Sequence, residues 1–132
     1  MRNFLVLLLL FSSVSFSSEG EFERWTVKGE KCVFKLQVPP SVNWDTESEL
    51  PISFKDVSAV FKNWANANLS NGEKAHATSY NLASVAPEGA SHNYWVFKVG
   101  YVVFNSGLPV QDFNRKVVID LSGKVISPVC GL

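Results

Sequence analysis

The chain has 132 residues, of which 46% are hydrophobic and 18% are charged, and its twelve basic side chains balance twelve acidic ones. This composition is typical of one near-neutral globular domain. Because binding to nucleic acid or to anionic lipid requires clustered Lys and Arg, the composition argues against both kinds of partner.

The first residues have the pattern of a secretory signal peptide. Arg2 precedes the apolar run Phe4–Phe11, and a serine-rich stretch, 12–18, follows it. The run is too short for a membrane span, which needs about 20 apolar residues. We therefore predict a signal peptide over residues 1–17 and a single domain over 18–132. The predicted location is secreted or periplasmic, with no membrane attachment after cleavage.

Two short β-type runs, 22–27 and 32–38, open the predicted domain, and the turn between them is centred on Gly29. Alternate apolar residues of the second run predict one inward face, made of Cys32, Phe34, Leu36 and Val38. Pro39 and Pro40 are expected to end this strand, because neither can donate a backbone hydrogen bond.

Cys32 and Cys130 are the two cysteines of the chain. In an oxidising compartment, two cysteines most simply form one disulfide. The alternative is a free nucleophilic cysteine with His76 or His92 as its base, but such a nucleophile is usually a single thiol in a recognisable local context. The sequence therefore predicts a Cys32–Cys130 disulfide that joins the start of the domain to its end.

An amphipathic helix is predicted from Ser53 or Phe54 to about Ser70. Ser53 is a favourable N-cap, and Asp56 takes the acidic place of a capping box. Residues at helical spacing predict one buried stripe: Val57, Val60, Phe61, Trp64, Ala65 and either Ala67 or Asn68. Gly72 suits a left-handed stop after the helix.

The rest of the chain has the pattern of β-strands. In the run 75–86 both faces are candidates for the core, which leaves its register open. The strongest strand is 93–104, whose predicted inward face is Trp95, Phe97, Val99, Tyr101 and Val103. A further strand, 115–121, leads into an Asp-x-x-Gly turn at 120–123. Because the connections are too short for crossover helices, we predict an α+β roll, with one long helix packed on an antiparallel sheet of four to five strands.

The outward face of the strongest strand is more apolar than a solvated sheet face usually is. It carries Tyr94, Val96, Val102 and Phe104. Such a face needs either a covering element or a partner protein. Cover within the chain is favoured, for example by the loop 105–114 with Leu108, Val110 and Phe113. If no cover is present, these four residues are the predicted partner-binding face.

Three segments carry a resemblance to a known family: the helical Val57–Ala65, the aromatic strand Tyr94–Val99, and Val117–Val125, in which Asp and a turn Gly follow an apolar strand. Over residues 53–127 the chain resembles the cystatin-like architecture, and more specifically the PepSY-like group of small exported domains. The resemblance implies a non-catalytic exported domain that binds or restrains other proteins, often peptidases. Residues 37–41 depart from the Gln-x-Val-x-Gly loop of the cystatin inhibitors, which argues against direct inhibition of papain-like peptidases.

Motifs for catalysis, metal binding or phosphate binding are absent from the sequence. His76 and His92 lack metal-ligand spacing, and the alternating Asp45, Glu47 and Glu49 are typical of a hydrated acidic loop. Asn68 begins an Asn-Leu-Ser glycosylation sequon, which has meaning only in a eukaryotic secretory pathway.

We therefore expect no catalytic residue, no metal and no cofactor. The expected function is a non-enzymatic secreted or periplasmic binding module, whose most specific form is an inhibitor or neutraliser of a secreted enzyme such as a peptidase. The alternative is a small-ligand-binding or hydrolytic site in a cone between helix and sheet.

Overall fold

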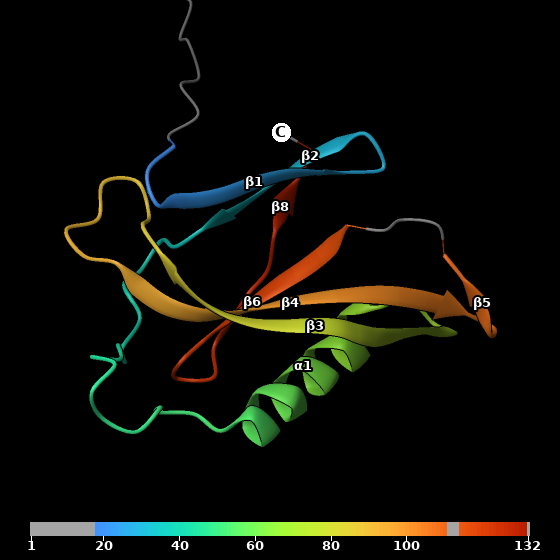
Figure 1. Ribbon diagram of the computed structural model, residues 1–132. Helices are drawn as coiled ribbons and strands as arrows, with labels where there is room; N and C mark the ends of the chain where they lie inside the picture. Colours follow the sequence, from blue (N-terminus) through green and yellow to red (C-terminus); the bar gives the residue numbers. More distant parts are fainter. Residues whose placement is uncertain (1–17, 111–113, 132) are drawn as a thin grey trace, which may run out of the picture.

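The computed structural model of the chain describes residues 18–110 and 114–131 (Figure 1). The expected signal peptide, 1–17, and the side chain of Phe113 lie outside the described residues. In chain order the elements are β1 (Glu21–Val27), β2 (Glu30–Lys35), α1 (Phe54–Asn68), β3 (Glu73–Val85), β4 (Tyr94–Asn105), β5 (Leu108–Pro109), β6 (Arg115–Asp120), β7 (Val125–Ile126) and β8 (Val129–Cys130).

The strands form two antiparallel sheets. The large sheet has the order β3-β4-β6-β7, with β5 also paired to β4, and the small sheet has the order β1-β2-β8. Helix α1 packs on one face of the large sheet and the small sheet lies over its other face (Figure 1). The predicted α+β class, with one helix on antiparallel strands, is confirmed, but the prediction of a single sheet of four to five strands is wrong.

The last strand explains why a second sheet forms. After β7 the chain passes Pro128, and β8 pairs with β2 at Cys32↔Cys130 and Val33↔Val129. The predicted disulfide is confirmed, with an S–S distance of 2.06 Å and a Cα–Cα distance of 4.0 Å. The N-terminal hairpin is therefore joined to the C-terminal strand instead of to an edge of the large sheet.

Helix α1 begins where its cap was predicted. The Ser53 side chain accepts a hydrogen bond of 3.1 Å from the backbone N–H of Asp56. Val57, Phe61 and Ala65 are buried at successive helical turns, against the inward residues of β4 and β6. The helix ends at Asn68, two residues earlier than predicted.

A β-bulge in β3 settles the register that the sequence left open. Ala75 and Ala77 pack against the helix-side core, and so do Tyr80 and Leu82, which have the opposite parity. The register shifts between Ala77 and Ser79, where one extra residue reverses the alternation, so that even-numbered residues face the helix-side core after the bulge and odd-numbered ones before it. Both halves of the strand therefore contribute to one core.

A second hydrophobic core lies between the two sheets. Phe34 from the small sheet is fully buried in it, together with Val96 and Val118 of the large sheet. The cover of Tyr94 and Val96 is therefore the small sheet. In the predicted covering loop, 105–114, Leu108 is 72% exposed and Phe113 lies outside the described residues. The predicted inward face of the second strand stops short of Val38, which is 64% exposed because β2 already ends at Lys35.

Candidate functional site

The first two residues of the predicted partner-binding face are covered within the chain. Tyr94 is 8% exposed and Val96 is fully buried, both in the core that includes Phe34 and Ile126. Neither side chain is available on the surface to a partner. The sequence identified an apolar face correctly but could not show that the N-terminal hairpin folds over it.

The other two residues of that face lie beyond the cover. Val102 and Phe104, near the end of β4, are partly exposed, and Figure 1 shows this end of β4 reaching past the β1–β2 hairpin. Three neighbours share their side of the sheet through strand register: Lys74 and Pro109 are opposite Phe104, and His76 is opposite Val102. The His76 and Phe104 rings meet edge to face, with centroids 6.0 Å apart. We call these five residues the distal patch.

The distal patch combines an apolar centre with a polar border. The exposed side chains of Lys74 and His76, from β3, flank the partly exposed Val102 and Phe104. An aromatic anchor with polar neighbours is the composition that protein interfaces favour. Sequence reasoning missed Lys74 and His76, the two residues that β3 contributes to the patch. Only the pairing of β3 with β4 determines which β3 residues lie beside Phe104.

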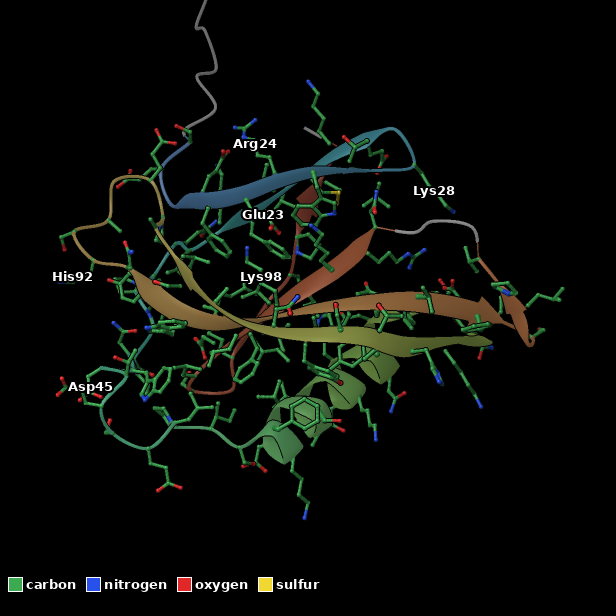
Figure 2. The ribbon with its side chains drawn as sticks, in the orientation of Figure 1. Glu23, Arg24, Lys28, Asp45, His92 and Lys98 are labelled. Carbon is green, nitrogen blue, oxygen red and sulfur yellow. A yellow bond between two sulfur atoms is a disulfide. The ribbon has the colours of Figure 1, made fainter. Side chains whose placement is uncertain are left out.

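A group of charges lies between the two sheets. Lys98 Nζ donates a hydrogen bond of 2.9 Å to Glu23 Oε1, and Lys116 Nζ lies 3.6 Å from Glu23 Oε2. The Lys116 ammonium also lies 5.1 Å from the centroid of the Trp25 ring. Figure 2 shows Glu23 reaching from β1 toward Lys98 on β4. These contacts tie the small sheet to the large one, and sequence reasoning missed them because they join strands far apart in the chain.

The acidic loop forms a turn of its own. Asp45 accepts hydrogen bonds from the backbone N–H and the hydroxyl of Ser48, at 2.8 and 2.7 Å, and from the backbone N–H of Glu47 at 2.9 Å. These bonds hold the pKa of the Asp45 carboxyl below its usual value, with the Ser48 bonds as the main cause. Asp45 therefore shapes the loop as a carboxylate.

The two histidines and the sequon lie on three different elements. His76 belongs to the distal patch, and His92 is exposed on the loop between β3 and β4 (Figure 2). Within the described part of the chain, no three His, Cys, Asp or Glu side chains are grouped so that they could hold a metal ion. Asn68 is exposed at the end of α1, and its side-chain amide donates to the Trp64 carbonyl oxygen at 2.8 Å.

Aromatic side chains fill the space between α1 and the large sheet. The Tyr101 ring centroid lies 5.4 Å from that of Phe61 and 5.8 Å from that of Trp64. The ring of Trp44, on the loop before α1, meets the ring of Trp95 in β4 edge to face, with centroids 5.4 Å apart. These contacts belong to one continuous hydrophobic core.

The chain matches no family model, no curated protein and no solved structure. The resemblance to the PepSY-like and cystatin-like domains therefore stays a prediction. Among residues 18–110 and 114–131, no helix has the length and apolar composition needed to cross a membrane.

Proposed function

We propose that this protein is a non-enzymatic, exported binding module that holds a secreted protein against the distal patch. The observation that carries the proposal is the end of β4 that lies beyond the small sheet, where Val102 and Phe104 are partly exposed although the small sheet buries Tyr94 and Val96 on the same face. Partly exposed apolar residues on a rigid sheet face are a favourable docking surface.

Export is part of the proposal, and two observations support it. The sequence begins with the pattern of a signal peptide, and the Cys32–Cys130 disulfide is of the kind that persists in oxidising compartments. The PepSY-like resemblance suggests that the partner is a secreted enzyme, and a peptidase is the first class to test. Inhibition or neutralisation of that enzyme is the corresponding role.

The alternative function, a small-ligand or hydrolytic site between helix and sheet, has less support. Such a site needs a cavity beneath α1. The Phe61, Trp64 and Tyr101 rings occupy that space. The alternative would need these rings to move apart before a ligand could enter.

Site-specific photo-crosslinking in the exporting cell tests the proposal. A crosslinking residue at Val102 or Phe104 is expected to capture one discrete exported protein. The same residue at Lys62, which is exposed on the outer side of α1, is the matched control and should capture none. With the captured protein purified, Phe104→Glu should weaken binding by about tenfold or more, because it places a charge in the apolar centre of the contact.

Two results would contradict the proposal. One is the absence of any product at both positions of the distal patch. The other is the same set of products from the patch and from Lys62, which would indicate contact without specificity. Circular dichroism of each variant shows whether the fold is kept.

A further inference from the structure

The outer edge of the large sheet is open along β3. This strand has 13 residues and is the first in the order β3-β4-β6-β7, so one of its sides pairs with β4 and the other has no neighbouring strand among residues 18–110 and 114–131. Among the described residues, no backbone hydrogen bond joins Lys74–Val85 to any element other than β4. Figure 1 shows β3 at the margin of the sheet, with α1 beneath it.

Unpaired edges usually carry features that prevent pairing with another chain, such as Lys, Pro or a bulge. In β3 these features are confined to the first half, where Glu73 and Lys74 begin the strand and the bulge lies between Ala77 and Ser79. The second half, Ser79–Val85, has no charge and no proline, and it pairs without interruption with residues 94–100 of β4. This half of the edge is therefore regular and uncharged over seven residues, and no described strand pairs with its outer side.

We propose that two copies of this chain associate by antiparallel pairing of Ser79–Val85 across a two-fold axis, which joins their large sheets into one. A two-fold contact brings the same segment of each copy together, so charges of one sign on the segment would lie near the same charges of the second copy. This segment has none. An uncharged edge of apolar, hydroxyl and amide side chains is thus compatible with itself, whereas it has no charged group that would select a charged foreign peptide.

The side chains favour one register, with the axis at Leu82. Leu82 then lies opposite Leu82 of the second copy, and Tyr80 lies opposite Ser84. Tyr80 and Leu82 both face α1 and are partly buried in the helix-side core. The second strand would extend that apolar face.

Phe54 gives a second reason for this placement. Its side chain is 59% exposed at the start of α1, although its ring packs edge to face on Tyr80 with centroids 4.9 Å apart. A strand added in this register would place Leu82 of the second copy diagonally from Tyr80, on the side of the sheet where Phe54 packs. The contact is separate from the distal patch and does not depend on the proposed function.

Sedimentation equilibrium of the purified, disulfide-bonded protein tests the association. We expect a monomer–dimer equilibrium in a concentration series up to about 1 mM, a range suited to a short strand contact. Asn81→Lys puts a charge on the exposed edge of each copy and should lower the association constant by about threefold or more. Asn63→Lys makes the same change on the exposed side of α1 and should leave the constant unaltered.

Engineered cysteines test the register. With the axis at Leu82, Leu82→Cys places two thiols directly opposite each other, where the Cα atoms of paired residues lie about 5 Å apart. Ser84→Cys is the control, since its two thiols would sit on Cα atoms about 14 Å apart, which exceeds the roughly 7 Å limit for a disulfide. Leu82→Cys should give a covalent dimer under mild oxidation and Ser84→Cys should not.

Three results would overturn the inference: a monomer at every concentration, a dimer whose stability Asn81→Lys and Asn63→Lys affect equally, or crosslinking of Ser84→Cys as fast as Leu82→Cys. The lysine variants do not touch the core, so the test remains decisive if a cysteine variant folds poorly.

Discussion

Replacement of both cysteines, by Cys32→Ala with Cys130→Ala, is expected to be among the most destabilising changes in the molecule. The two residues are 98 positions apart, so the disulfide closes most of the described chain into one loop. In the chain-entropy relation, a loop of that length removes about 16 cal/mol/K from the unfolded state, which corresponds to about 4.7 kcal/mol at 25 °C. For a domain of about 115 residues, whose unfolding entropy is about 240 cal/mol/K, the melting temperature should fall by about 20 °C.

The structure shows where the loss should begin. Strand β8 pairs with β2 at only two positions, and one of these is the disulfide itself. The other nearby backbone bond runs from the Gly131 N–H to the Lys31 carbonyl oxygen, at 3.0 Å. Without the covalent link, β8 has too few contacts to remain paired with β2. The small sheet that carries Phe34 then loses one of its three strands.

Thermal and denaturant unfolding of the wild-type and double-alanine proteins measures the change. Amide exchange adds a local measurement, because Val33 in β2 should lose protection before Val99 in β4 does. The wild-type protein unfolded after full reduction should refold with the stability of the variant. A loss of less than about 1 kcal/mol, or equal loss of protection at both residues, would refute the reasoning that the disulfide closes the small sheet and restricts the unfolded chain.

Three further predictions concern single side chains. Glu23→Gln should lower the free energy of unfolding in urea by about 1–3 kcal/mol, because it leaves two mostly buried lysines without their carboxylate. The control Glu30→Gln, at an exposed position, should change it by no more than about 0.5 kcal/mol. Equal effects of the two variants would contradict the role of the charge group. The pKa of the Asp45 carboxyl, measured by NMR titration, should lie below 3.8. Because the folded pKa is lowered, the contribution of Asp45 to stability is present above pH 3.8 and is lost as the pH falls through the folded pKa. A measured pKa at or above 3.8 would be inconsistent with its hydrogen bonds. In thermal melts, Gly20→Ala should destabilise the protein more than Gly29→Ala does, by about 1 kcal/mol or more. Both glycines have a positive φ, but only at Gly20 would the new Cβ lie 2.5 Å from a backbone oxygen. Equal losses of stability in the two variants would refute this reasoning.

Local pattern determined much of this protein. The Ser53 cap and the apolar spacing from Val57 to Ala65 depend on neighbours within a turn or two, so the sequence was sufficient to predict α1. The alternation along β4 likewise predicted which residues face the helix, and the core formed by Phe97, Val99 and Val103 confirms it. The disulfide was predictable because the chain has only two cysteines.

Tertiary structure decided everything that depends on which distant segments meet. No local signal showed that β8 would leave the large sheet for β2, that the hairpin would cover Tyr94 and Val96, or that Glu23 would meet Lys98. The bulge in β3 was equally hidden, since either parity of that strand is locally acceptable. Alternative strand pairings satisfy the local backbone preferences of this chain about equally well. The packing of the whole chain therefore determines which pairing forms.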